Sequence, residues 1–216
     1  MEKYVLEPKN DCKICKRLEI FRKKNLAEEP QWHNKPVKSF GSINSNILIV
    51  GLAPGKKGAN RTGRPFTGDG AGETLYTTLI KHNLAKGKYC PNGFDNLEPV
   101  NCRISNVVRC VPPQNKPIAS EFSNCSNFLK QEINAMENLE LILALGRDSF
   151  YSIIKIFELK TTQYLFIHNK LNILPNKIKL ISSFHCSRYN TNTKRLTKQM
   201  FDQVFIKIKN NINFAL

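Results

Sequence analysis

The chain has 216 residues, of which 33 are Lys or Arg and 17 are Asp or Glu, so its formal net charge is +16. This length suits one sizeable hydrophobic core, and we expect a single domain over residues 1–216. The longest apolar runs, residues 47–50 and 141–145, are far shorter than the roughly 20 residues of a transmembrane helix, so we expect no membrane association. The basic excess favours a nucleic-acid partner. The chain is also rich in Lys, Asn and Ile throughout, and a biased nucleotide composition of the gene would by itself produce such an excess of Lys.

The N-terminal segment MEKYVLEPKND is charged where a signal peptide would be apolar, and its acidic residues are atypical of transit peptides. We therefore expect a cytoplasmic protein in a reducing environment. In that environment, seven cysteines are better candidates for metal or cluster ligands than for disulfides.

The first predicted element is an amphipathic helix over 12–26, followed by a buried strand at 47–50 and a Gly-rich and Arg-rich loop over 52–70. A helix over 73–84, a strand at 103–108, a helix over 119–136, a strand at 139–145 and a helix over 148–157 come next. A weak hairpin from 164–167 and 171–174, a strand at 178–183 and a closing helix over 196–212 complete the chain. Strands that alternate with helices predict a layered α/β fold with a parallel sheet.

Ligands of open parallel sheets bind beyond the carboxyl ends of the strands. Three predicted loops occupy that position, namely 52–70, 108–117 and 184–193. They contain most of the unusual residues of the chain, so we expect the functional site there.

Four cysteines have spacings typical of metal ligands. Cys12 and Cys15 form a C-x2-C pair, and fourteen residues separate Cys110 from Cys125. Four thiolates could hold a tetrahedral zinc ion or a 4Fe-4S cluster, and the spacing does not distinguish the two. Some of these cysteines could instead be small buried residues of the core. The other three cysteines lack a partner at ligand spacing, and we expect free thiols at Cys90, Cys102 and Cys186.

The segment GLAPGKKGANRTGRPFTGDGAGETL, residues 51–75, contains seven glycines and four basic residues. Glycine permits close backbone approach, and a helix that begins near Gly70 would stabilise an anion or a developing negative charge at its N-terminus. A Walker A loop does not fit, because Gly51 and Gly55 are one residue too close and Lys57 replaces Ser or Thr. A dinucleotide-binding fingerprint fits poorly, because its glycines should follow the strand directly.

Two residues of this segment have both a structural and a functional interpretation. Asp69 directly precedes the helix, where Asp is a preferred N-cap that stabilises a helix by about 1 kcal/mol. Phe66 could belong to the core, but an aromatic residue in a polar loop is also a plausible platform for stacking a nucleobase.

Three segments together resemble the iron-sulfur group of the uracil-DNA glycosylase superfamily, and within it family five, or type b. They are GLAPGKKGANRTGRPFTGDGAG at 51–72, NVVRCVPPQNKP at 106–117 and SSFHCSRYNTNTKRLT at 182–197. Related iron-sulfur enzymes have Glu where this chain has Leu52, and this difference indicates family five. The resemblance spans nearly the whole chain and implies a three-layer α/β/α fold with a central, mainly four-stranded parallel sheet.

The resemblance further implies a monofunctional DNA-repair hydrolase, active near the nucleoid as a monomer. It would flip uracil, and other deaminated bases such as hypoxanthine, out of DNA and hydrolyse the N-glycosidic bond to leave an abasic site. The implied catalytic residues are Asp69, which would position water, and His185, which would stabilise charge on the departing base. The implied base-binding residues are Gly51, Ala53, Gly55, Phe66 and Asn106.

The resemblance also assigns DNA contacts and a cofactor. The implied DNA-binding residues are Arg61, Arg64, Ser187, Arg188 and Lys194. A 4Fe-4S cluster would be held by Cys12, Cys15, Cys110 and Cys125, and it would be structural, tying the N-terminal segment to the rest of the domain. The family usually has His-Pro-Ser where this chain has His185-Cys186-Ser187, a difference that could loosen this loop.

One alternative is a non-catalytic nucleic-acid-binding protein with a four-cysteine zinc or cluster site. In such a protein Asp69 and His185 would have structural roles only. Cleavage of uracil-containing DNA distinguishes the two.

Overall fold

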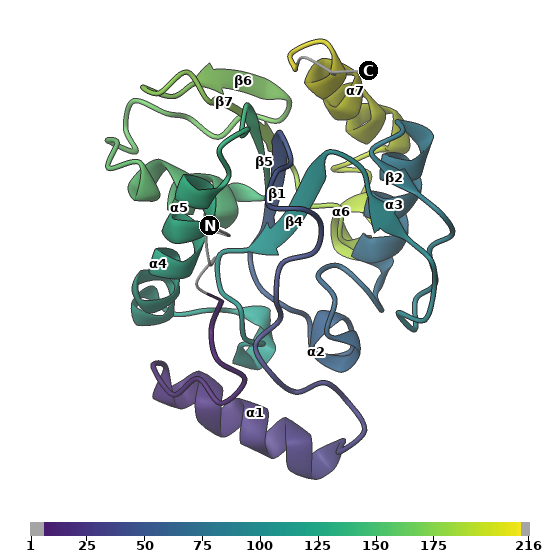
Figure 1. Cartoon of the computed structure of the whole chain (residues 1–216), viewed down its shortest axis with the longest axis vertical. Coiled ribbons are helices and arrows are strands. Elements are labelled where there is room, and N and C mark those ends of the chain that lie inside the picture. The colour runs from purple at the N-terminus through teal and green to yellow at the C-terminus, as the bar shows by residue number, and fades with distance from the viewer. Residues whose placement is uncertain (1–6, 213–216) are drawn as a thin grey trace.

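A five-stranded sheet with the strand order β4-β1-β5-β7-β6 lies at the centre of the fold (Figure 1). The computed structural model describes residues 7–212, so part of the segment MEKYVLEPKND, from which we expected no leader, lies outside the described residues. Four strands run parallel: β4 (Cys102–Asn106), β1 (Ile47–Gly51), β5 (Leu141–Leu145) and β7 (Lys179–Ser183). The fifth, β6 (Lys170–Ile173), is antiparallel to β7 at one edge. The expected, mainly parallel sheet is confirmed.

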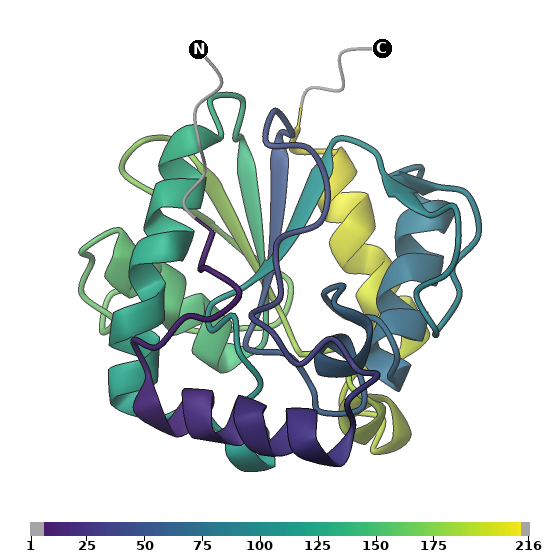
Figure 2. The ribbon, with the colours of Figure 1, turned by 60° about the horizontal axis from the view of Figure 1, so that its bottom comes forward.

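Helices cover both faces of this sheet, as Figure 2 shows. Helices α3 (Gly70–Lys81) and α7 (Lys198–Lys209) pack on one face, and α4 (Ala119–Ala135) and α5 (Arg147–Ile156) pack on the other. The alternation of side chains along β1 explains the two layers, since residues 47 and 49 join the α3 and α7 core while 48 and 50 join the α4 and α5 core. All five residues of β1 are buried, as a strand covered on both faces requires.

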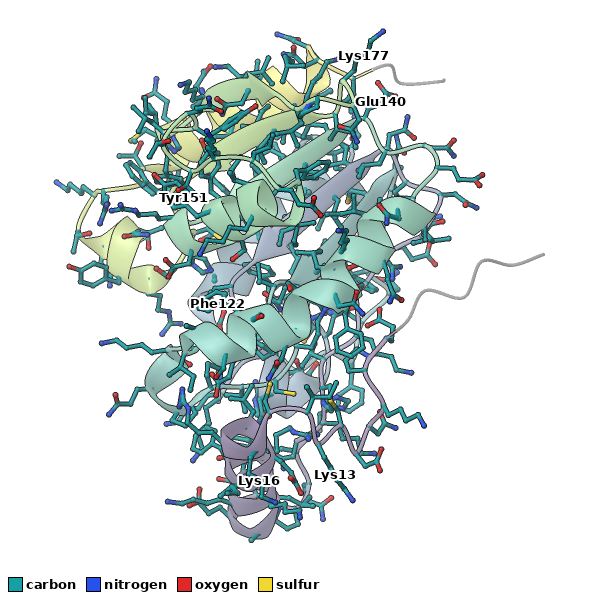
Figure 3. The ribbon with its side chains drawn as sticks, turned by 90° about the vertical axis from the view of Figure 1, so that its left-hand side faces the viewer. Lys13, Lys16, Phe122, Glu140, Tyr151 and Lys177 are labelled. Atoms are coloured by element: carbon teal, nitrogen blue, oxygen red, sulfur yellow. The ribbon has the colours of Figure 1, made fainter. Side chains whose placement is uncertain are left out.

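Helix α1 (Lys16–Glu28) lies outside these three layers, across the end of the molecule toward which the parallel strands run (Figures 1 and 2). In Figure 3, Lys16 at the start of α1 lies below α4, which carries Phe122. The N-terminal segment therefore lies at the same end of the sheet as the three predicted loops.

Several short elements connect the main ones. They are α2 (Ala59–Thr62), the strand pair β2 (Ala85–Lys86) and β3 (Glu98–Pro99), a 3-10 helix (Pro113–Asn115) and α6 (Arg188–Asn192). The predicted loop over 184–193 thus contains a short helix. Within residues 7–212, no helix has the length and apolarity to cross a membrane.

The predicted hairpin between 164–167 and 171–174 is wrong. Residues 164–167 form no strand, and β6 pairs instead with β7, with Leu171 opposite Ile181. This pairing satisfies backbone donors and acceptors along the edge of β7, which a separate local hairpin would leave unpaired.

Candidate active site

The three predicted loops meet at the carboxyl edge of the sheet, as expected. In the parallel register Gly51, the last residue of β1, lies opposite Asn106, the last residue of β4. His185 follows the end of β7 by two residues, and Ser183 accepts a hydrogen bond from Gly146 N, which follows β5, at 2.8 Å. Residues from distant parts of the sequence therefore converge on one region.

A tight cluster of Gly51, Phe66 and Asn106 forms the centre of this region. A Cβ atom at position 51 would lie 2.4 Å from Cζ of Phe66 and 2.6 Å from Oδ1 of Asn106, so only glycine allows this approach. Phe66 is buried with a left-handed backbone (φ 52°), and Asn106 is buried as well. The ring and the amide are thus held against the end of β1.

His185 joins the cluster by stacking on Phe66, with ring centroids 5.7 Å apart and an interplanar angle of 23°. Its backbone oxygen accepts a hydrogen bond from Nδ2 of Asn190 at 2.8 Å, which ties the loop to α6. Burial lowers the pKa of His185, and the negative charge of Asp69 only partly opposes that shift. The imidazole is therefore neutral at pH 7 and can donate one hydrogen bond.

Asp69 is the N-cap of α3. Its Oδ1 accepts hydrogen bonds from Ala71 N at 3.0 Å and Gly72 N at 3.3 Å. Its Oδ2 faces the glycine loop, since it would lie 3.1 Å and 2.5 Å from Cβ atoms placed at Gly55 and Gly58. The cap also explains why α3 begins at residue 70, as the Asp69 cap predicts, although the apolar pattern itself indicated a helix only over 73–84. One carboxylate oxygen therefore serves the helix while the other faces the loop at the end of β1.

The other residues of the first loop lie around this cluster. Ala53 is half-buried and packs against the α4 and α5 side of the core. The backbone oxygen of Gly55 accepts hydrogen bonds from Gly58 N at 3.2 Å and Asn60 N at 3.1 Å, which shapes the loop into α2.

The residues predicted to contact DNA differ in how exposed they are and in the hydrogen bonds that their side chains already make. Arg188 and Lys194 are exposed on and just after α6, and the Arg188 side chain lies across Gly70 at the start of α3. Ser187 is the N-cap residue of α6, without a side-chain capping bond. Arg61 is half-buried and donates to the backbone oxygens of Lys57 at 3.0 Å and Pro91 at 3.2 Å.

Arg64, which the resemblance assigns to DNA binding, is enclosed by other residues of the protein. Both of its terminal nitrogens bond Asp95 at 2.7 Å, and its guanidinium lies 5.2 to 5.9 Å from the rings of Phe40, Tyr76 and Tyr89. Only 13% of the side chain is exposed. Arg64 thus links the first loop to Asp95 and uses both terminal nitrogens in that ion pair. Its partner Asp95 was missed, because no motif or spacing connects residues 64 and 95.

Cys12, Cys15, Cys110 and Cys125, the four cysteines at ligand spacing, line one small cavity beside α1 and α4. Arg22, Arg109 and Phe128 are among its other lining residues. Asn124 Nδ2 donates to Sγ of Cys15 at 3.5 Å, and the Arg109 N–H donates to Sγ of Cys125 at 3.3 Å. Among residues 7–212, however, no three Cys, His, Asp or Glu side chains converge closely enough to define a metal centre. The four thiols therefore share a cavity without forming a closed ligand shell.

The other three cysteines lie elsewhere. Cys102 and Cys186 are buried in the core on the α3 and α7 side, and Cys90 is half-buried on the loop between β2 and β3. Sγ of Cys186 approaches the backbone oxygen of Ala71 at 3.5 Å. This contact packs the loop after β7 against α3, so the residue in place of the usual Pro is firmly enclosed.

A buried ionic cluster that sequence reasoning missed lies beneath β4. Glu132 of α4 is fully buried and binds Arg103 at 2.6 Å, Arg109 at 2.5 Å and Ser105 at 2.8 Å. Arg109 directly precedes Cys110, and Ser105 directly precedes Asn106. The cluster therefore connects the cysteine cavity with the strand that carries the buried amide.

Two further cavities lie nearby. One of about 230 Å³ is bordered by Leu52, Phe184, His185 and Arg195, so it adjoins the imidazole that stacks on Phe66. Another of about 690 Å³ lies between α4 and α5, near Phe122 and Tyr151 (Figure 3). None of the predicted site residues lines the second cavity, so we assign no role in catalysis to it.

The arrangement of these residues defines a class of binding site. A glycine-lined strand end, an aromatic ring, a buried amide and a neutral imidazole form a setting for a planar heterocycle with polar edges. The family model described as "Uracil DNA glycosylase superfamily" matches residues 38–209, and the chain belongs to that superfamily.

Named relatives agree with this family. The type-5 uracil-DNA glycosylase of Thermus thermophilus is 37% identical over 204 residues, covering 92% of each chain. The type-5 enzyme of Pyrobaculum aerophilum is 34% identical and covers 90% of this chain and 86% of its own. The type-4 uracil-DNA glycosylase of Sulfurisphaera tokodaii is more distant, at 28% identity over 81% of this chain. These similarities support the resemblance to family five noted in the sequence.

Proposed function

We propose that the protein is a monofunctional DNA-repair glycosylase that hydrolyses the N-glycosidic bond of uracil in DNA and leaves an abasic site. The observation that carries this proposal is the convergence of Gly51, Phe66, Asn106 and His185 at one edge of the sheet. The reacting nucleotide must leave the base stack to reach such a site. The same site would admit other deaminated bases such as hypoxanthine.

The amide of Asn106 would select the base. It can accept a hydrogen bond from N3–H of uracil and donate one to O4, whereas cytosine presents the opposite pattern at both positions. Because Asn106 is buried, a mismatched base would leave polar groups unpaired, which discriminates strongly. The ring of Phe66 would contact the flat face of the base.

Cleavage of the bond places negative charge on the departing base and positive charge on the sugar. The backbone N–H groups of the loop from Gly51 through Ala53 to Gly55, and the neutral imidazole of His185, would stabilise the charge on the base. Oδ2 of Asp69 faces this loop, and it would orient water and stabilise the sugar cation. No Lys nucleophile takes part in this scheme, so no strand cleavage is expected.

Polar and basic residues of the loops around Gly51, Phe66 and Asn106 would bind the DNA backbone. We assign this role to Arg61, Ser187, Arg188 and Lys194. Arg64, which is ion-paired with Asp95, is left out of this set.

We further propose that Cys12, Cys15, Cys110 and Cys125 hold a 4Fe-4S cluster that is structural. Their common cavity and their all-sulfur donor set support the assignment. Burial raises the pKa of Cys110 to about 12 and that of Cys125 to about 11, so both thiols stay protonated until a metal binds. A cluster would join the segment before α1 to α4 and to the chain that follows Asn106. The whole of 1–216 would then act as one domain with an N-terminal cluster-binding segment.

One assay tests the enzymatic proposal. A labelled duplex with a single uracil is incubated with the protein, treated with alkali and resolved by size; a duplex with thymine at that position is the control. We expect alkali-dependent cleavage of the uracil strand only. Absence of cleavage across pH and salt would favour the non-catalytic alternative. Gly51→Ala should abolish cleavage, because the added methyl group would displace Phe66 and Asn106.

The cofactor is tested separately on anaerobically purified protein by its iron and zinc content and its visible absorption. Four irons per chain with a brown colour support the cluster, and stoichiometric zinc without colour contradicts it.

As a repair enzyme acting on chromosomal DNA, the protein would work as a monomer in the cytoplasm beside the nucleoid.

A further inference from the structure

The two most exposed large apolar side chains of residues 7–212 are both aromatic and both lie on segments beside the candidate active site. Phe94 is 88% exposed and Tyr189 is 72% exposed. Tyr189 belongs to α6, within the third family motif. Phe94 lies outside every family motif, on the loop that joins β2 to β3, and nothing in the proposed catalytic scheme uses it.

The loop that carries Phe94 is rigidly constructed. The carboxylate of Asp95, whose side chain is only 3% exposed, accepts hydrogen bonds from Cys90 N at 2.7 Å and Leu97 N at 3.1 Å. The N–H of Phe94 itself donates to Oδ1 of Asn92 at 2.8 Å. A preorganised loop loses little conformational entropy on binding, so its exposed side chain is suited to contact a partner.

The same loop is fastened directly to the first active-site loop. Asp95 pairs with both terminal nitrogens of Arg64, and Arg61 donates to the backbone oxygen of Pro91 at 3.2 Å. A Cβ atom at Gly93 would lie 3.5 Å from Cβ of Thr62. Phe94 is therefore carried by a segment in contact with residues 61–68, immediately before the capping residue Asp69.

The two joined loops carry basic residues, which favours a polyanion over an apolar protein as the partner of Phe94. Arg61, Lys57 and Lys88 lie on the two joined loops, and Lys57 and Lys88 are exposed. Proteins that bind locally unpaired DNA combine an aromatic ring, on which a nucleobase stacks, with basic residues that attract the backbone.

We propose that Phe94 stacks on a nucleobase beside the extruded nucleotide and so contributes to binding of the damaged strand. The proposal rests on the proposed function, since it requires DNA in the adjacent site. Phe94 is a binding residue in this scheme, and it contacts neither the reacting bond nor the departing base.

The first test measures the dissociation constant for a duplex that contains a stable abasic-site analogue, by fluorescence anisotropy. Phe94→Ala should weaken binding about 5- to 150-fold, the range that corresponds to the loss of one stacked base. Ile173→Ala is the matched control, because Ile173 is 55% exposed and lies at the opposite end of the sheet, across from Lys179 at the start of β7. The control should bind like the unmodified protein. Equal affinities for all three proteins would overturn the proposal.

The second test observes the stacking directly. The only tryptophan of the chain is Trp32, so Phe94→Trp in a Trp32→Phe background gives a single fluorescent reporter at position 94. Its emission should be quenched by the abasic duplex, with affinity close to that of the unmodified protein. Unchanged emission at saturating DNA would contradict stacking and would leave Phe94 as a contact for another macromolecule.

These measurements do not depend on turnover. If the protein failed to cleave uracil yet the reporter were quenched, the catalytic proposal would fail while the stacking proposal stood. If cleavage were normal and Phe94→Ala bound DNA without loss, only the stacking proposal would fail. Thermal unfolding of each variant checks that this exposed position leaves the fold unchanged.

Discussion

Asp69→Asn separates the two roles of this residue, because the structure gives each carboxylate oxygen a different neighbour. Oδ1 accepts the capping hydrogen bonds from Ala71 N and Gly72 N, and Oδ2 faces the glycine loop at Gly55 and Gly58. Asparagine keeps an acceptor oxygen for the cap and loses only the negative charge. Asn and Asp are about equally good N-caps, so the helix should remain capped.

The expected magnitudes differ widely for the two roles. Loss of the charge at the N-terminus of α3 costs about 0.3–1 kcal/mol, which shifts the melting temperature of a protein of this size by at most about 4 °C. Loss of a group that stabilises charge in the transition state typically costs a factor of about 100 to 1,000 in turnover. Asp69→Asn should therefore fold normally and cleave at least about 100-fold more slowly.

Single-turnover cleavage of a uracil duplex, with enzyme in excess, measures this loss without interference from product release. Asp69→Ala is the control, since it removes the cap as well and should cost about 1 kcal/mol of stability. If Asp69→Asn cleaved within about threefold of the unmodified rate while Asp69→Ala melted early, Asp69 would be a helix cap and nothing more.

Three further predictions concern charge. Because burial lowers the pKa of His185, turnover should be constant above pH 6.5 and fall at lower pH as the imidazole gains a proton, and His185→Gln should remove this limb from the pH–rate profile. Hydrogen bonds from Arg64 lower the pKa of Asp95 to about 2. The contribution of this ion pair to the free energy of unfolding should therefore be complete above about pH 4 and be lost toward pH 2. In urea unfolding, Asp95→Asn should make the free energy of unfolding less dependent on pH over this range. Glu132→Gln would remove the fully buried counter-charge of Arg103 and Arg109 and leave them only the carboxylate of Glu7, at 3.3 Å and 3.5 Å. The loss should cost about 3 to 5 kcal/mol, and calorimetry should record a melting temperature lower by about 6 to 20 °C. A shift below about 2 °C would contradict the buried ionic cluster.

Much of the fold was predictable because its core elements have strong local patterns. The continuous apolar runs that became β1 and β5 were predicted to within about two residues at their ends. The errors lie where local patterns are weak. The short helix α6 follows a polar loop, and the pairing of β6 depends on an open edge of β7 that no local pattern reveals.

The position of the candidate site was predicted from the motifs and from the loops that follow the strands. The motifs did not indicate which way each side chain points or what it contacts. Arg64 and Arg61 are both arginines of the same glycine-rich loop, and the sequence does not distinguish them. In the structure the guanidinium of Arg64 is enclosed by Asp95 and three aromatic rings. The positions of Asp95, Glu132 and Phe94 depend on contacts between segments more than 25 residues apart. Such contacts leave no spacing signal in a single chain.

The amino-acid sequence by itself determined the alternation of strands and helices and the three loops that follow parallel strands. It also determined the family to which the chain is similar. These properties follow from periodicity and short motifs, which are local. The tertiary structure alone decided which basic residues are exposed and which are paired, and how Asp69 divides its two oxygens between helix and loop. It also decided that Phe94 is exposed on a loop in contact with residues 61–64. Those outcomes depend on burial and on pairing across the folded chain, where the sum of packing and electrostatic interactions, and not local propensity, fixes each side chain.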